Sequence, residues 1–249
     1  MTAPAMVAEF DDVAAWTAEA VEQLGDQHAI PAACRGSSSP AALAWLAEAC
    51  ELSPGDQLLD VGAGSGGPAA WAARRFGVRP ILLEPMPSAG RAAARLFGLP
   101  VVTADGRHIP LRDASIDVAW CLGVLCTVED KAAVLREIQR VLGPHASLGL
   151  LVVVANRPVP EPPDGNHFPT QSELADVLDH TGFDLVEQTE RPAAVPLSWT
   201  RRAAEVTAHI TARYRTHPAY TLATSQDTRL GRLFTAGDPT LQLLHAVKR

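Results

Sequence analysis

The apolar residues at the start of the chain recur at helical intervals. Between Phe10 and Leu24 they return every three to four positions, which predicts an amphipathic helix. Glycine, serine and proline are concentrated in Ile30–Pro40, which predicts a loop. A second helix is expected from Ala41 to Cys50, ending before a turn at Ser53–Asp56. The chain is therefore expected to begin with a helical segment.

From Gln57 onward, short apolar runs alternate with helical periods. The expected strands are Gln57–Val61, Arg79–Glu84, Pro100–Ala104, Ile116–Leu122, Ser147–Ala155, Phe183–Gln188 and Leu241–Arg249. The expected helices between them are Pro68–Phe76, Ser88–Phe97, Lys131–Leu142 and Gln171–Thr181. Strands that are apolar on both faces are typical of parallel sheets covered by helices. The alternation predicts an α/β fold, with a doubly wound, mostly parallel seven-stranded sheet and helices on both of its faces.

The alternation stops after Arg191, where an apolar stripe from Trp199 to Tyr214 predicts a further helix. We expect four regions: an N-terminal helical cap at 1–39, the core at 40–191, a helical insertion at 192–239 and the final strand at 240–249. The insertion is longer than the sheet needs, and long connections without a structural need are usually functional. We therefore expect it to act as a lid that forms the substrate pocket together with the N-terminal helices.

The charge of the chain limits its partners. The 249 residues carry a formal net charge of −7, which argues against nucleic acid as the main partner, because phosphate binding needs a basic surface. The insertion reverses this charge locally, with one glutamate, Glu205, between Arg191 and Tyr220. The basic residues of this region are Arg191, Arg201, Arg202, Arg213 and Arg215. Two explanations fit this excess of arginine: the substrate that accepts the chemistry is anionic, or the arginines form a solvated face.

The cysteines and the apolar runs indicate the compartment. The four cysteines have no spacing typical of a zinc site, which favours buried free thiols in a reducing cytosol. The segment Met1–Asp12 lacks a basic stretch followed by an apolar one, so no signal peptide is expected. A run of about eighteen apolar residues, as a membrane span requires, does not occur. We expect a soluble, cytoplasmic protein with no membrane partner.

The stretch LLDVGAGSGGPAAW, Leu58–Trp71, places a glycine-rich turn between the first strand of the sheet and its helix. Gly62-x-Gly64-x-x-Gly67 fits the fingerprint of dinucleotide-binding proteins. Asp60, followed by Gly62-x-Gly64-x-Gly66, resembles the first motif of methyltransferases that use S-adenosylmethionine (SAM). The turn alone leaves both ligands open.

Glu84 ends the second strand and favours an adenosine-containing ligand without distinguishing the two. A carboxylate there would accept hydrogen bonds from the ribose hydroxyls of NAD or of SAM. The alternative is a solvated carboxylate at a strand end. In both cases such a residue is expected to make few core contacts, so its removal should hardly change the stability of the free protein.

The region Val101–Leu150 resembles the class I SAM-dependent methyltransferases of small molecules as an ordered set of motifs. It contains Asp105-Gly106 after the third strand, Asp117 in the fourth strand, and the helix end REIQRVLGP at Arg136–Pro144. The sequence departs from the family at Gly143–Ser147, where Pro-Gly-Gly is usual. The Tyr-x-x-x-Lys pair of a dehydrogenase is missing from the sequence. The resemblance implies SAM as cofactor and methyl transfer to a small-molecule acceptor, such as a natural-product intermediate.

The resemblance also implies which residues contact the cofactor. The floor under methionine and ribose would be formed by Asp60, Gly62, Ala63, Gly64 and Gly66. Pro85 and Met86 would lie against one adenine face. Asp105 would accept a hydrogen bond from the adenine amino group, with the Gly106 N–H reaching a ring nitrogen. Cys121 and Leu122 would lie on the sulfonium side, and Arg35 would pair with the carboxylate of SAM or with an acidic substrate.

Several of these residues have a structural alternative. Asp105 is also typical of a turn, Cys121 of a core, and Arg35 of a solvated surface. If the acceptor needs a base, His167 is the first candidate and His28 the second, although either histidine also fits a packed or exposed position. Metal-dependent O-methyltransferases have acidic and amide ligands where this chain has Cys121-Leu122 and Ala155-Asn156. No metal is therefore expected.

Two other functions are compatible with the same motifs. The fold could catalyse a non-methylating reaction, such as a cyclisation or an elimination, with the sulfonium as a fixed charge. It could also be a binding module that senses SAM without turnover. Fold resemblance alone does not separate these functions.

Overall fold

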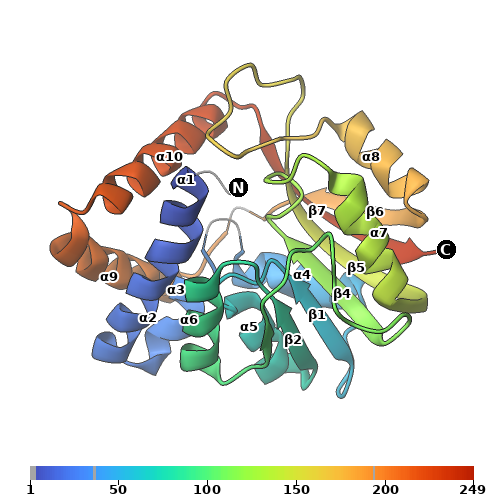
Figure 1. Ribbon diagram of the computed structural model, residues 1–249, viewed down its shortest axis with the longest axis horizontal. Helices are drawn as coiled ribbons and strands as arrows, with labels where there is room; N and C mark the ends of the chain where they lie inside the picture. The colour runs from blue at the N-terminus through green and yellow to red at the C-terminus, as the bar shows by residue number, and fades with distance from the viewer. Residues whose placement is uncertain (1–3, 36–37, 193) are drawn as a thin grey trace.

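The computed structural model describes residues 4–35, 38–192 and 194–249. In these ranges seven strands form one sheet in the order β3-β2-β1-β4-β5-β7-β6 (Figure 1). They are β1 (Gln57–Val61), β2 (Arg79–Leu83), β3 (Val101–Val102), β4 (Ile116–Leu122), β5 (Leu142–Val154), β6 (Phe183–Glu190) and β7 (Thr240–Lys248). In this sheet β7 runs antiparallel to both of its neighbours, and the other six strands run parallel to one another. The predicted doubly wound, mostly parallel α/β fold is confirmed.

Helices cover both faces of the sheet. The helices of the core are α4 (Pro40–Ala49), α5 (Gly67–Phe76), α6 (Pro87–Phe97), α7 (Lys131–Val141) and α8 (Gln171–His180). Leu135 of α7 and Leu174 of α8 are buried in one apolar cluster with Leu59. Leu43 of α4 is buried in a second cluster with Leu58. Because successive strand residues point to opposite faces, both faces of β1 are apolar and both are covered.

The N-terminal segment and the insertion pack on each other. The former consists of α1 (Pro4–Met6), a π-helical turn η1 (Val7–Asp12), α2 (Val13–Leu24), a 3-10 turn η2 (Asp26–His28) and α3 (Ala29–Ala33). The latter contains α9 (Leu197–Tyr214) and α10 (Pro218–Thr235). Trp16 stacks on Tyr214 at 4.3 Å between ring centroids, and Val206 and Ile210 are buried in the same cluster. Figure 1 shows both segments at one side of the sheet.

The structure differs from the sequence-based expectation in two places. Ala29–Ala33 is helical, where the loop was expected to begin at Ile30. Pro31 is compatible with a first helical turn, because its missing N–H would have no partner there. Gly36 and Ser37 of the expected loop lie outside the described residues. Helix α10 was not expected, because it buries only Ala223 and Gln226 and therefore has a weak apolar period.

None of the helices in the described ranges is both long and apolar enough to cross a membrane.

Candidate cofactor and acceptor site

The glycines of the turn between β1 and α5 serve different purposes. Gly64 has a φ of +54°, and a Cβ built on it meets no heavy atom within 4 Å. A Cβ on Gly67 would lie 2.5 Å from the carbonyl carbon of Ala33 and 2.6 Å from the nitrogen of Cys34. Gly67 therefore allows the end of α3 to lie against α5, whereas Gly64 borders open space. The space in front of Gly64 is where a ligand can approach the backbone.

Glu84 connects the end of β2 to this turn. Its side chain is buried, with Oε2 accepting a hydrogen bond from the Gly64 N–H at 2.7 Å. Oε1 accepts one from the Met86 N–H at 2.8 Å. The expectation of few contacts is therefore wrong, because the carboxylate holds two backbone donors of two different loops. An ionised carboxylate has about four acceptor positions, so capacity for ligand hydroxyls remains.

Asp60 is a buried carboxylate below the turn. It is 1% exposed, and its Oδ2 has no hydrogen-bond partner among the described residues. Burial raises the pKa of Asp60 to about 7, and the negative charge of Glu84 adds to this shift. A buried carboxylate oxygen without a partner is costly, and a cationic ligand would relieve that cost.

Asp105 is engaged within its own turn. Its Oδ1 accepts hydrogen bonds from the backbone N–H of Arg107 at 2.9 Å and from the Arg107 Nε at 2.8 Å. Its Oδ2 accepts one from Nη2 of Arg107 at 2.7 Å. The hydrogen bond from Arg107 holds the pKa of Asp105 below its ordinary value. The free protein thus shows the turn-forming alternative, and a contact with adenine would have to share the carboxylate with Arg107.

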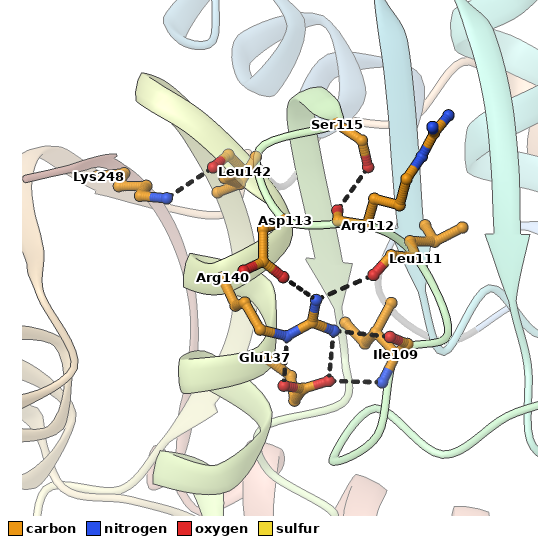
Figure 2. Close-up of polar contacts among 9 residues, drawn as sticks. All are labelled: Ile109, Leu111, Arg112, Asp113, Ser115, Glu137, Arg140, Leu142 and Lys248. Carbon is orange, nitrogen blue, oxygen red and sulfur yellow. Dashed lines mark hydrogen bonds and ion pairs between the residues drawn. The ribbon is translucent and has the colours of Figure 1, made fainter.

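The loop that carries Asp105 and Gly106 is fastened to α7 (Figure 2). Arg140 donates to the carbonyl oxygens of Ile109 and Leu111 at 2.7 and 2.9 Å and to Asp113 at 2.6 Å. Glu137 accepts from Arg140 and from the Ile109 N–H, both at 2.8 Å. Hydrogen bonding by Arg140 lowers the pKa of Glu137 to about 2. This network explains the Glu and Arg of the REIQRV motif, which position the loop.

The remaining cofactor candidates differ in accessibility. Pro85 is exposed, and Met86 is half-buried against an alanine cluster that includes Ala14 of α2. Leu122 is half-buried at the end of β4. Cys121 has no exposed surface and belongs to the apolar core, so the core alternative describes its side chain in the free protein. All four cysteines are buried free thiols, as expected.

A cavity of about 590 Å³ lies between the N-terminal segment and the insertion. Its charged lining residues are Arg35, Arg191 and Asp227. Cys34 also lines the cavity while its backbone lies against Gly67, so the cavity adjoins the glycine turn without including it. Of the five arginines that would favour an anionic acceptor, only Arg191 is part of the described lining. The alternative of a solvated face fits Arg201, Arg213 and Arg215, which are exposed.

His28 is occupied by structural contacts. It is buried, and its Nε2 lies 2.6 Å from Oε2 of Glu205 in α9. Its Nδ1 lies 3.1 Å from the carbonyl oxygen of Gly25. With both ring nitrogens engaged, the structure contradicts the prediction that His28 is a base. The alternative of a packed histidine describes it.

His167 lies apart from the 590 Å³ cavity. Its backbone N–H donates to the carbonyl oxygen of Cys126 at 2.7 Å. It contributes to a second, more open cavity at the start of α7, next to Glu129, Lys131 and Glu173. The structure therefore does not bring the two histidine candidates together.

Glu9 is a candidate that the sequence analysis missed. It lies on the π-helical turn η1 and is half-buried. Burial raises its pKa to about 7, Asp227 raises it further, and Arg35 opposes the shift. Glu9 thus belongs to one charged group with two residues of the cavity lining. No sequence motif surrounds Glu9. What marks it in the structure is its place on a π-helical turn, a feature that is frequent at functional sites.

The described residues contain no group of three or more histidine, cysteine, aspartate or glutamate side chains arranged to hold a metal ion.

Comparison with known proteins identifies the family. A family model described as "Methyltransferase domain" matches residues 59–150. Over these residues the chain is similar to that methyltransferase family. The methyltransferase GfsG of Streptomyces halstedii is 34% identical over 120 residues, which cover 44% of this chain and 42% of that protein. The O-methyltransferase resE of Aspergillus sclerotiorum is 32% identical over 154 residues, covering 55% and 58%. The chain thus spans about half the length of these curated relatives.

Solved structures agree with this methyltransferase fold. The crystal structure of the [4+2]-cyclase SpnF has a TM-score of 0.66 and 25% identity, covering 83% of this chain and 79% of that chain. The geranyl diphosphate C-methyltransferase of Streptomyces coelicolor A3(2) has a TM-score of 0.64 and 15% identity, covering 84% and 76%. The latter similarity concerns the fold alone. The resemblance to class I SAM-dependent methyltransferases is confirmed.

Proposed function

We propose that this protein transfers a methyl group from SAM to a small-molecule acceptor by in-line displacement. The observation that carries the proposal is the open space at Gly64, whose N–H donates to the buried carboxylate of Glu84. SAM offers ribose hydroxyls to the free acceptor positions of Glu84. It also offers positive charge to the Asp60 oxygen that has no partner in the described structure. When bound, SAM supplies the reactive methyl group on its sulfonium.

The chain's own residues would bind and orient the two reactants. Gly62, Ala63, Gly64 and Gly66 give backbone room, and the loop of Asp105 and Gly106 would receive the adenine. Arg140 holds that loop in place. Holding an acceptor in line with the methyl group can by itself provide much of the rate. No metal ion is part of this proposal.

The acceptor is placed in the 590 Å³ cavity. Its volume falls in the range of about 300–1,000 Å³ that is typical of small-molecule sites. The insertion at 192–239 covers it as a lid together with the cap at 1–39, and this arrangement keeps water from the reacting groups. Relatives named O-methyltransferases favour oxygen as the acceptor atom.

An acceptor hydroxyl must lose its proton. We assign this proton to Glu9, because a carboxylate with a pKa of about 7 is half ionised at neutral pH, where a general base works best. Glu9 itself is not among the described lining residues, but it is charge-coupled to Arg35 and Asp227, which both line the cavity. His167 is the alternative base if the acceptor enters the second cavity instead.

A specific observation favours a second candidate function. SpnF, which shares this fold over 83% of the chain, is described as a [4+2]-cyclase. The same cavity could therefore hold a substrate for a non-methylating cyclisation. A SAM-binding module without turnover is the third candidate.

Two measurements separate these functions. Calorimetry is expected to show binding of SAM and S-adenosylhomocysteine and much weaker binding of NAD, and tighter binding of NAD overturns the proposal. Incubation with methyl-labelled SAM and a cell extract is expected to yield a labelled small molecule by mass spectrometry. A product without label favours the cyclase, and binding without any product favours the module.

A further inference from the structure

Arg191 has an unusual position at the end of β6. Its backbone N–H donates to the carbonyl oxygen of Leu241 at 2.8 Å, which fixes its main chain to β7. The side chain is half-buried and lines the 590 Å³ cavity. Its Nε is fully covered and finds no hydrogen-bond partner in residues 4–35, 38–192 and 194–249. A buried donor on a charged group is costly when it remains unpaired.

The other charges of the cavity do not compensate Arg191. Asp227 is the one acid in the described lining, and its Oδ2 lies 3.9 Å from Nη2 of Arg35. The charge of Glu9 also interacts with Asp227 and Arg35, so Glu9 belongs to this pair of residues and not to Arg191. Arg191 forms no ion pair with any described residue. The cavity therefore lacks one negative charge, at Arg191.

The walls of the cavity expose more apolar than polar surface. The larger apolar residues of the lining are Val13, Pro31, Val195, Trp199, Val206 and Ile210. An occupant with a hydrophobic body would bury its surface against these side chains. The chemistry of the site thus combines apolar walls with one guanidinium that has no counterion.

We propose that Arg191 anchors a carboxylate of an otherwise apolar acceptor. A guanidinium matches a carboxylate with two parallel hydrogen bonds, and such charge-assisted bonds are about twice as strong as neutral ones. The carboxylate would pair with the Nη atoms of Arg191, since Nε is fully covered, and would supply the counterion of the cavity, whereas an amine at the same place would be repelled. This inference rests on the proposed function in one respect: the cavity is taken as the acceptor site.

Matched probes test the anchor. Phenylacetate, indole-3-acetate and dodecanoate are each compared with the corresponding primary amide, by calorimetry on the full chain saturated with S-adenosylhomocysteine. We expect at least one acid to bind about ten- to a hundredfold more tightly than its amide, as a charge-assisted pair implies. Arg191→Gln is expected to abolish this preference. Arg202→Gln is the matched control, because Arg202 lies on α9 outside the described lining and should keep the preference.

The outcomes are distinguishable. If no acid binds more tightly than its amide, or if Arg191→Gln keeps the preference for the acid, the proposed anchor is overturned. An ordered water would then be the hydrogen-bond partner of Nε. If Arg191→Gln does not fold, as judged by thermal unfolding, Arg191→Lys keeps the charge but loses the paired geometry, and an unchanged preference there overturns the anchor. If the protein prefers acids but does not bind SAM, the role of Arg191 as an anchor is retained and the methyltransferase proposal is rejected.

Discussion

Oε2 of Glu84 accepts a hydrogen bond from the Gly64 N–H at 2.7 Å, which joins the end of β2 to the glycine turn after β1. The second oxygen of the same carboxylate accepts from the Met86 N–H. One side chain therefore shapes the turn that we assign to the cofactor and keeps free acceptor positions for its ribose.

Glu84→Ala is expected to weaken SAM binding and to destabilise the free protein. Loss of two charge-assisted hydrogen bonds to the ribose should reduce affinity roughly ten- to a hundredfold. The N–H groups of Gly64 and Met86 would lose their acceptor, at about 1–3 kcal/mol each. Calorimetry and thermal unfolding without ligand measure both effects. Glu190→Ala, at an exposed strand end, is the control, and an unchanged melting temperature in Glu84→Ala would contradict the structural role.

Asp60 should release protons when SAM binds. Its pKa is raised to about 7, so about half of the molecules carry the proton at pH 7. A positively charged ligand favours the carboxylate and lowers that pKa, so the proton leaves. Calorimetry in two buffers of different ionisation enthalpy measures the release, which should disappear at pH 9 and in Asp60→Asn. S-adenosylhomocysteine has the same amine without the sulfonium and should release fewer protons. Equal release by both ligands would count against Asp60 as the partner of the sulfonium.

Glu9 should make the stability of the protein depend on pH. Its folded-state pKa of about 7 lies above the unfolded value of 4.5, so the folded state binds this proton more tightly. The associated stability is fully present below pH 4.5 and is lost as pH rises through 7, by at most about 3 kcal/mol. Denaturant unfolding at pH 5 and pH 8 should therefore give a smaller difference for Glu9→Gln than for the unchanged chain. If the unsubstituted protein and Glu9→Gln show the same difference in stability between pH 5 and pH 8, folding does not raise the pKa of Glu9.

The insertion should not exchange as one mobile unit. Helix α9 is fixed to the N-terminal segment by the His28–Glu205 pair and by the stacking of Trp16 on Tyr214. Helix α10 buries Ala223 and Gln226, as few residues as α9 does, and its side-chain ties run from Gln226 and Arg229 to Asp164 in the loop after β5. Hydrogen exchange is expected to be slow in α9 and faster in α10, and to slow in α10 when cofactor and acceptor bind. His28→Ala should speed exchange in α9 while leaving SAM affinity within about twofold, an estimate for a residue that touches no ligand. Equal protection of α9 and α10 without ligand would contradict this division.

His167→Ala is expected to leave methyl transfer and SAM affinity within about twofold, because the residue lies outside the lining of the 590 Å³ cavity. Label transfer from SAM and calorimetry measure the two quantities, with Glu9→Gln assayed beside it. A large loss of turnover with unchanged SAM affinity would instead restore His167 as the proton acceptor and move the acceptor to the second cavity.

The sequence by itself predicted the sheet, and it indicated the strand ends at which we propose the cofactor site. Apolar runs of strand length, the glycine turn at Gly62–Gly67 and the spacing to Glu84 are local patterns, and local patterns set secondary structure and the loops at the strand ends. The order of these motifs also favoured SAM over NAD. The sequence did not reveal the hydrogen bonds that Glu84 accepts in the free protein. Their donors are backbone N–H groups, which nearly every residue has, so no residue type marks them.

The tertiary structure alone decided the acceptor side of the site. His28 meets Glu205 across 177 residues of sequence, and this contact removes the histidine from the candidates for a base. Glu9, Arg35, Arg191 and Asp227 come from four distant segments and carry no shared motif. Their meeting depends on how α2, α3, α9 and α10 pack around buried residues such as Val206 and Ile210. Apolar burial is non-directional, so the sequence indicates that these helices pack but not which charged side chains the packing brings together.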